Sequence, residues 1–363
     1  MEEKRIIENI VSQFPVHIHI EDCHIYGSGH INDTYLVENS KKYILQRINT
    51  NIFKNPDQLM ENIVNVTEFL KKKIIENGGD PERETLTVIY TKDHKPYYQD
   101  EDGCCWRMYN FIENTTSYDE VRNDDDFYQS AVSFGKFQSL LADFPAHTLH
   151  ETIEKFHDTH DRFLKFKKAV EEDVCQRAKD VQEEIQFVLD REDIANILGD
   201  LQKEGKLPLR VTHNDTKLNN ILIDNETHQG ICVIDLDTVM PGLAVNDFGD
   251  SIRFGASTGA EDEKDLSRIE CDMHLFEIYT KGFVEGCDNK LTEEEMNCLP
   301  IGAKVMTYEC GMRFLTDYLQ GDVYFKTQYP THNLDRCRTQ FKLVKDMEDK
   351  WDIMNKIVEK YRL

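Results

Sequence analysis

The residues whose types and spacing fit a chemical role are Asp215, Asn220 and Asp235. Asp215 follows His213 in a polar stretch and precedes Asn220 by five residues, while Asp235 ends an apolar run. A carboxylate in such a loop can orient a hydroxyl group and accept its proton. An amide oxygen and a carboxylate are hard donors of the kind that Mg²⁺ takes. Since His-x-Asp-x-x-x-x-Asn is the spacing of a kinase catalytic loop, the pattern predicts Asp215 as the catalytic base and Asn220 and Asp235 as magnesium ligands.

A predicted β-hairpin positions the two metal-binding residues. Its strands are Ile221–Ile223 and Ile231–Ile234, and its turn ends in Gly230. Asn220 immediately precedes the first strand and Asp235 immediately follows the second, so an antiparallel hairpin places them side by side at its open end. The alternative is that these residues only cap turns, as Asp and Asn often do. That alternative holds for each residue singly, whereas the combination favours a site.

A second acidic motif, Asp247-Phe248-Gly249, spells the metal-binding motif of protein kinases. It follows a loop containing Pro241-Gly242 rather than the end of a hairpin strand. We therefore expect Asp247, together with His213, to support the catalytic loop through hydrogen bonds instead of binding metal.

The hydrophobic periodicity divides the chain into a β-rich part, residues 1–112, and a mainly α-helical part, residues 113–363. Strands are expected over 32–37, 43–48, 85–90 and 106–112, and helices over 56–76, 127–143, 159–172 and 177–204. This order predicts an α+β fold with two lobes, like that of protein kinases. The first lobe would bind the nucleotide, and the second would hold the catalytic loop and the acceptor.

Several stretches resemble the N-acetylhexosamine 1-kinases, within the aminoglycoside phosphotransferase and choline kinase superfamily. They are residues 210–222, 234–238, 247–257, 29–32, 43–46, 309–315 and 321–325. That family transfers the γ-phosphate of ATP to the anomeric hydroxyl of free N-acetylglucosamine or N-acetylgalactosamine. The resemblance implies that Asp215 is the base for the 1-hydroxyl and that His30, Arg313 and Tyr324 contact the sugar. From the residues alone, two alternatives stay open: Arg313 as an ordinary ion-pair partner and Tyr324 as a core residue.

The nucleotide-binding residues are expected in the β-rich part. Gly27 and Gly29 lie in a turn where the backbone can close over phosphates, although two glycines are also common in a plain hairpin. Kinases usually carry a lysine on the following strand, and Gln46 takes that place here. The cation that replaces this lysine is left open. Backbone groups near Asn110 and Ile112 are expected to meet the adenine.

The composition excludes several classes of protein. A net charge of −25 argues against a nucleic-acid partner, which would require a basic face. No apolar run approaches the about 18 residues that a membrane helix needs. The N-terminus lacks an apolar signal core, and the ten cysteines form no C-x-x-C pair. We expect a cytoplasmic protein with reduced thiols.

Two alternatives to a hexosamine kinase remain open at this point. One is the same chemistry on another small hydroxyl acceptor, such as a different sugar, a choline-like amino alcohol or an aminoglycoside. The other is a kinase-shaped binding protein without turnover. A binding protein has no need for a proton acceptor, so the joint presence of Asp215, Asn220 and Asp235 argues against it. The sequence does not determine the oligomeric state.

Overall fold

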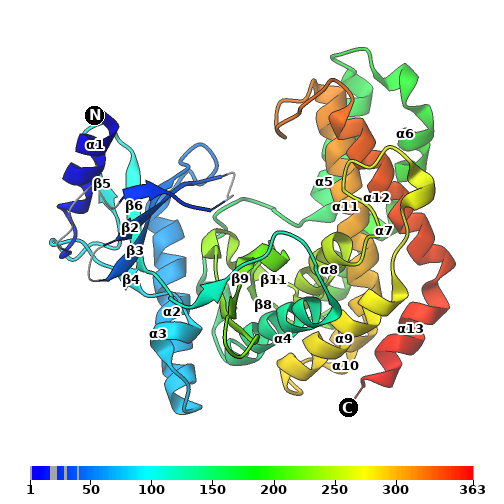
Figure 1. The fold of residues 1–363 in the computed structure, drawn as a ribbon. Helices are drawn as coiled ribbons and strands as arrows, with labels where there is room; N and C mark the ends of the chain where they lie inside the picture. Colours follow the sequence, from blue (N-terminus) through cyan, green and yellow to red (C-terminus); the bar gives the residue numbers. More distant parts are fainter. Residues whose placement is uncertain (1, 17–22, 28–30, 39–40, 363) are drawn as a thin grey trace. The chain divides into compact units, whose positions relative to one another are not determined.

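The computed structural model describes residues 2–16, 23–27, 31–38 and 41–362 of the chain (Figure 1). The chain forms two compact units. The first comprises Met1–Thr116, His147–Glu154 and Leu222–Met240, and the second comprises Ser117–Ala146, Lys155–Ile221 and Pro241–Leu363. The predicted lobe boundary after residue 112 stays a prediction.

An antiparallel sheet forms the centre of the first unit. Its strands follow the order β1-β2-β3-β6-β4, and β5 also pairs with β6. The strands are β1 (Cys23–Ile25), β2 (Asp33–Glu38), β3 (Lys42–Ile48), β4 (Val88–Ile89), β5 (Tyr98–Gln99) and β6 (Cys105–Asn110). The expected strand over 85–90 is therefore much shorter than the pattern suggested. In the β3–β6 register Gln46 lies directly opposite Arg107.

Helices α1 (Glu2–Val11) and α2 (Pro56–Glu76) lie on opposite sides of this sheet (Figure 1). Ile10 of α1 and Phe14, just beyond the end of that helix, belong to a core that also contains Leu45 and Met108. Because side chains alternate along a strand, the neighbours of Leu45 and Met108 point to the other face of the sheet. Gln46 and Arg107 belong to that other face.

The first unit continues through α3 (Pro81–Glu84) into a small three-stranded sheet of order β10-β9-β7. Its strands are β7 (Thr115–Thr116), β9 (Ile221–Asp224) and β10 (Gly230–Val233). Strands β9 and β10 are joined by five residues, a connection that suits only an antiparallel pair. The predicted hairpin is thus present. A single 3₁₀ turn, η5 (Leu236–Thr238), follows it.

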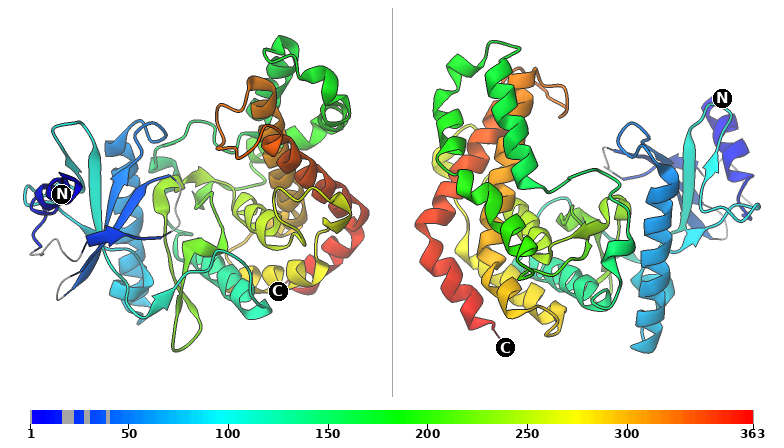
Figure 2. Two further views of the ribbon diagram at one scale, coloured as in Figure 1. Left: turned by 45° about the horizontal axis from the view of Figure 1, so that its top comes forward. Right: turned by 180° about the vertical axis from the view of Figure 1, so that it is seen from behind.

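The second unit consists mainly of helices (Figures 1 and 2). They are α4 (Asp124–Leu140), α5 (Thr159–Glu172), α6 (Gln182–Leu189), α7 (Glu192–Lys203), α8 (Ala244–Gly255), α9 (Met273–Cys287), α10 (Glu293–Asn297), α11 (Leu299–Gln320), α12 (His332–Asp349) and α13 (Trp351–Lys360). Gly135 of α4 and Gly286 of α9 let these two helices pack backbone to backbone, since a Cβ on either would collide with the partner. Phe248 of α8 packs edge-on against Phe276 and Phe283 of α9.

The prediction of a single helix over 177–204 is wrong, because α6 and α7 are separate helices. The expected helix is broken at Arg191, whose backbone leaves the helical region at φ −121° and ψ 28°. The Arg191 guanidinium forms two hydrogen bonds to Glu348 of α12, at 3.0 and 2.8 Å, and a third to the Phe187 carbonyl. These tertiary contacts break the helix although the helical pattern of the sequence is uninterrupted. The sequence alone does not reveal such contacts.

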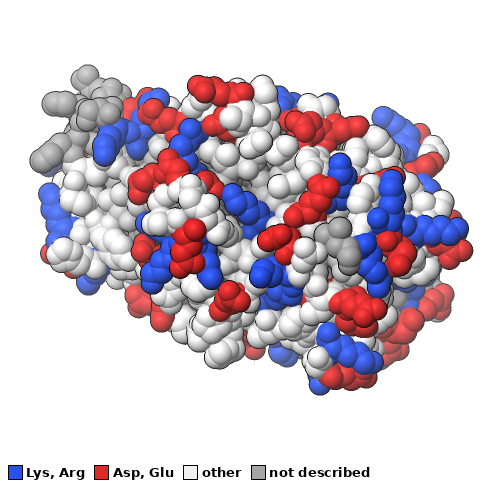
Figure 3. Space-filling view, turned by 90° about the horizontal axis from the view of Figure 1, so that it is seen from below, with Lys and Arg blue, Asp and Glu red and all other residues white. Residues whose placement is uncertain are grey.

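All ten cysteines are free thiols, as expected for reduced cysteines, and Cys175 is the exposed one. Among the residues that the structure describes, none of the helices combines the length and apolar character needed to cross a membrane. Acidic and basic side chains are interspersed on the face shown in Figure 3. The negative net charge is thus not gathered into one patch on that face.

Candidate active site

The loop that follows β8 (Arg210–Thr212) is held through its backbone by Asp247. The Asp247 carboxylate, in the first turn of α8, accepts hydrogen bonds from the N–H groups of His213 and Asn214, both at 2.8 Å. Gln138 of α4 donates to the same carboxylate at 2.9 Å. Burial raises the pKa of Asp247, and the hydrogen bonds and charge at His213 oppose that rise. Asp247 of the Asp-Phe-Gly motif thus forms hydrogen bonds to the loop backbone, and its role as a supporting residue stays a prediction.

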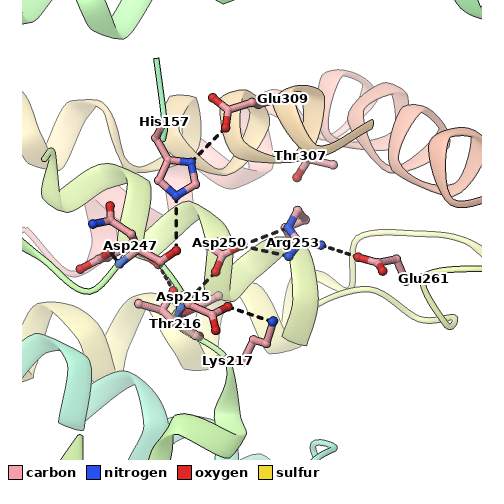
Figure 4. Close-up of polar contacts among 12 residues, drawn as sticks. His157, Asp215, Thr216, Lys217, Asp247, Asp250, Arg253, Glu261, Thr307 and Glu309 are labelled. Atoms are coloured by element: carbon pink, nitrogen blue, oxygen red, sulfur yellow. Dashed lines mark hydrogen bonds and ion pairs between the residues drawn. The ribbon is translucent and has the colours of Figure 1, made fainter. Parts of the chain in front are cut away.

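A second carboxylate on α8, Asp250, holds the next part of the loop (Figure 4). It accepts the N–H of Thr216 at 3.0 Å. Its other oxygen accepts two hydrogen bonds from Arg253, which in turn pairs with Glu261 at 2.9 Å. Asp250 and Arg253 are both buried, so this part of the loop rests on a fixed ionic network. Sequence reasoning did not assign these residues a role, although Asp250 lies three residues after Asp247.

Asp215 itself is partly exposed and is oriented at both carboxylate oxygens. The Lys217 ammonium lies 2.9 Å from Oδ1, and the Asn220 amide nitrogen donates to Oδ2 at 3.2 Å. Asn220, which closes the 3₁₀ turn η4 (Leu218–Asn220), also donates to the backbone carbonyl of Asp215 at 2.8 Å. Burial lowers the pKa of Lys217, but the charges of Asp215 and Asp250 outweigh it and leave that pKa raised. The carboxylate therefore has a fixed direction and a protonated neighbour.

His157 ties the same loop to α11, a link that the sequence did not reveal (Figure 4). Its Nδ1 lies 2.9 Å from the Glu309 carboxylate and its Nε2 lies 3.3 Å from the Asn214 carbonyl oxygen. Thr159 donates to the other Glu309 oxygen at 2.6 Å. Both partners of the His157 ring can only accept, so a ring with both nitrogens protonated satisfies both contacts. The expectation that His157 is a surface or structural histidine is met in its structural form.

In the first unit, the two acidic residues after β10 have different surroundings. Asp235 is exposed and adopts a left-handed backbone conformation, with φ 58° and ψ 58°. Asp237 is buried, forms an ion pair with Arg107 and accepts a hydrogen bond from the Asn32 amide at 2.6 Å. Gln46 accepts two hydrogen bonds from the same guanidinium, at 3.0 and 2.8 Å. Gln46, in the place of the usual lysine, is thus bound to a cation that the sequence did not single out.

The expected nucleotide contacts are only partly described. Gly27 lies in a bend with φ +80°, a conformation that favours glycine, and Gly29 falls outside the described residues. The backbone N–H of Asn110 donates to the Thr87 carbonyl at 3.1 Å. The Ile112 carbonyl accepts the Thr115 hydroxyl at 2.8 Å. The adenine-binding roles of Asn110 and Ile112 stay predictions.

Two of the three expected sugar contacts lie together in the second unit. The guanidinium of Arg313, on α11, lies 5.8 Å from the centre of the Tyr324 ring and 5.5 Å from the Phe156 ring. Tyr324 is 61% exposed, so it is not a core residue. His30 lies outside the described residues.

The segment that carries Tyr324 is fixed by Asp317 of α11. This buried carboxylate accepts the backbone N–H groups of Val323, Tyr324 and Phe325, at 2.9, 2.8 and 3.0 Å. Carboxylate hydrogen bonds of this kind are stronger than neutral ones. The exposed tyrosine is therefore held on an ordered turn next to Arg313.

A comparison with known protein families decides the assignment. The model described as the phosphotransferase enzyme family matches residues 22–274, well over half of the chain. The chain belongs to this family. The match spans the loop with Asp215, the hairpin and the Asp-Phe-Gly motif. The chain is thus a phosphotransferase.

Solved structures of phosphotransferases share its fold. An aminoglycoside phosphotransferase from Alicyclobacillus acidocaldarius has a TM-score of 0.63 at 13% identity, covering 97% of this chain and 96% of that one. A choline kinase from Cryptosporidium parvum has a TM-score of 0.60 at 12% identity, covering 98% and 99%. The amicoumacin kinase hAmiN, in complex with AMP-PNP, Ca²⁺ and Ami, has a TM-score of 0.60 at 13% identity, covering 96% and 94%. The predicted protein-kinase-like α+β fold is confirmed.

Proposed function

We propose that this phosphotransferase transfers the γ-phosphate of ATP to the anomeric hydroxyl of an N-acetylhexosamine, in a magnesium-dependent reaction. The observation that carries the transfer is the doubly oriented carboxylate of Asp215, beside Lys217 and Asn220, in a loop anchored by α8. A nucleotide donor is also consistent with the neighbouring kinase structure that contains AMP-PNP. The hexosamine acceptor rests on the sequence resemblance.

In this proposal Asp215 directs the sugar 1-hydroxyl and accepts its proton. The hydroxyl oxygen forms a bond to the γ-phosphorus while the bond between that phosphorus and the leaving β-phosphate oxygen breaks. The products are the sugar 1-phosphate and ADP. Such transfer depends mostly on positioning and charge stabilisation, which explains why the loop is fixed at so many backbone groups.

The donor atoms of Asn220 and Asp235 suit magnesium. The Asn220 amide nitrogen is used by Asp215, which leaves its carbonyl oxygen as the atom for a metal. Asp235 supplies an exposed carboxylate. Both are oxygen ligands that Mg²⁺ prefers. Mg²⁺ bound there would neutralise charge on the β- and γ-phosphates.

The acceptor region favours a neutral polyhydroxy compound. Arg313 offers fixed N–H donors for ring hydroxyls, and Tyr324 offers a hydroxyl next to an apolar ring. The same guanidinium would repel a cationic acceptor such as choline or an aminoglycoside. Another neutral sugar remains the second candidate. We also propose a cytoplasmic location, because free thiols suit a reducing compartment.

An ADP-release assay with Mg·ATP and a panel of acceptors tests the function. The panel contains N-acetylglucosamine, N-acetylgalactosamine, other free sugars, choline and aminoglycosides, with Asp215→Asn as the inactive control. We expect turnover with the N-acetylhexosamines, and a phosphorus NMR signal of a sugar 1-phosphate. Turnover with choline or an aminoglycoside alone would contradict the acceptor assignment. Mg·ATP binding without turnover on any acceptor would support a binding protein instead.

A further inference from the structure

The first unit contains a buried arginine that the proposed chemistry does not use. Arg107 of β6 has only 1% of its surface exposed. Its guanidinium pairs with Asp237 and donates two hydrogen bonds to the side-chain amide oxygen of Gln46. It also lies 5.3 Å from the centre of the Tyr109 ring. An arginine is seldom buried unless its charge is paired. This one is paired with an acidic residue two positions after the proposed metal ligand Asp235.

The same contacts explain why Gln46 replaces the usual strand lysine. A lysine at position 46 would bring a second cation against the Arg107 guanidinium, directly across the two strands. It would also remove the carbonyl oxygen that accepts two of the guanidinium N–H groups. Gln46 is in turn fixed by its own donation to the Thr34 hydroxyl at 3.0 Å. The cation of this region therefore lies on β6 rather than on β3, and its guanidinium contacts protein groups.

Asp237 is held on both of its carboxylate oxygens. Arg107 pairs with Oδ1, and Asn32 donates to Oδ2 at 2.6 Å while its own carbonyl oxygen accepts the Asn49 N–H at 3.0 Å. The Asp237 backbone carbonyl also accepts the Thr152 hydroxyl at 3.2 Å. Separate segments of the first unit thus converge on the turn η5, which begins directly after Asp235.

Asp235 requires such support. Its left-handed conformation, with φ 58°, is unfavourable for residues other than glycine, so the surrounding contacts help to hold it. A buried ion pair adds little to stability by itself, because desolvation of both charges offsets their attraction. What the pair does provide is a fixed direction for the turn.

We propose that Arg107 and Asp237 form a positioning pair that holds the Asp235 carboxylate in the orientation needed to bind the metal of a metal–nucleotide complex. The inference rests on the proposed function, since it takes Asp235 as a metal ligand. Arg107 and Asp237 are both buried, so the proposal gives them no contact with the substrate. Both act through the backbone of η5, and Gln46 acts through Arg107.

The test separates positioning from stability. In the double variant Arg107→Met and Asp237→Asn, both charges are removed together, so no charge is left buried and unpaired. The matched control is Arg47→Met, which removes an arginine from β3 whose ion pair with Asp33 is about half exposed. Thermal unfolding reports stability. Titration of the full chain with Mn²⁺ and ADP, followed by the electron paramagnetic resonance signal of free Mn²⁺, reports metal binding, and calorimetry with metal-free ADP reports the nucleotide alone.

We expect the double variant to keep the unfolding midpoint of the natural protein while its Kd for Mn²⁺·ADP rises at least about tenfold, as when other residues that orient metal ligands are removed. Binding of metal-free ADP stays unchanged, and Arg47→Met behaves like the natural protein. Unchanged Mn²⁺·ADP binding in a folded double variant overturns the inference. Failure of the natural protein to bind Mn²⁺·ADP at all overturns the proposed function and the inference with it.

A milder variant keeps the test decisive if the double variant fails to fold. Arg107→Lys retains the charge near Asp237 but cannot reproduce the two-pronged hydrogen bond to Gln46. We expect a smaller loss of Mn²⁺·ADP affinity than in the double variant, again with metal-free ADP unaffected. An Arg107→Lys protein with natural Mn²⁺·ADP affinity overturns the proposal, as does one that loses ADP affinity equally with and without metal.

Discussion

Replacement of Asp247 by asparagine should lower stability and turnover without removing the metal dependence. The carboxylate accepts three hydrogen bonds, from the N–H groups of His213 and Asn214 and from Gln138. Asparagine has one acceptor oxygen, so its NH₂ group must face at least one N–H donor. The variant therefore loses at least one hydrogen bond to a charged group and leaves a buried donor unsatisfied.

The expected cost follows from that count. A hydrogen bond to a charged group contributes about 1.5–3 kcal/mol, so we expect the free energy of unfolding to fall by about 2 kcal/mol. For a unit of 150–250 residues this corresponds to a decrease of about 4–8 °C in Tm. The kcat should fall because the backbone of the loop carrying Asp215 loses its anchor, while the Mg²⁺ concentration for half-maximal rate stays the same.

The matched comparison is Asp235→Asn. Asp235 is exposed, so this substitution should change the free energy of unfolding by less than about 0.5 kcal/mol. It should instead raise the Mg²⁺ concentration needed for turnover. Thermal unfolding and ADP release over a range of Mg²⁺ concentrations measure both quantities for both variants. The reasoning is refuted if Asp247→Asn keeps its fold and abolishes the metal-dependent rate while Asp235→Asn does not.

Three further substitutions test other parts of the molecule. Asp215→Asn should lower kcat in the ADP-release assay by about 10²–10⁴-fold, as for loss of a general base, with the KM for ATP little changed; full activity would remove Asp215 from catalysis. Gly302→Ala should cost about 1–3 kcal/mol in urea unfolding, because its Cβ would collide with the backbone of α8; Gly199→Ala, which meets nothing within 4 Å, is the control and should not destabilise, and equal effects would contradict the packing argument. Burial raises the pKa of Glu309, but His157 outweighs burial and leaves that pKa below its usual 4.5. The carboxylate therefore contributes stability above about pH 4.5, and this contribution is lost as the pH falls through the pKa of Glu309 in the folded protein. The stability difference between the natural protein and Glu309→Gln should therefore shrink below pH 4.5 in pH-dependent urea unfolding, and a constant difference would show that the ion pair is not its source.

The sequence predicted the local features of this fold well. The strands around Gln46, the long helix from Pro56 and the hairpin after Asn220 all have periodic patterns bounded by turn residues. Their formation depends on residues close in the chain. The motif spacing around Asp215 is itself local, so it predicts a catalytic loop from neighbouring residues alone, and that role stays a prediction.

Contacts between distant residues were not predictable in the same way. The ion pair of Arg107 with Asp237 and the link from His157 to Glu309 join residues more than a hundred positions apart. Nothing in the local pattern of β6 indicates that Arg107 pairs with Asp237. The break at Arg191 likewise depends on a partner in a distant helix.

The distribution of thiols in this chain makes it convenient to label. Burial raises the pKa of the buried cysteines, among them Cys232, Cys287 and Cys337, so at neutral pH they hold few reactive thiolates. Cys175 is the exposed one of the ten, and its sulfur lies close to Gly321, at the end of α11 and just before the turn that carries Tyr324. A maleimide dye should therefore attach mainly at Cys175 without any cysteine being replaced. A fluorophore there would report any change in that turn when the proposed acceptor is added.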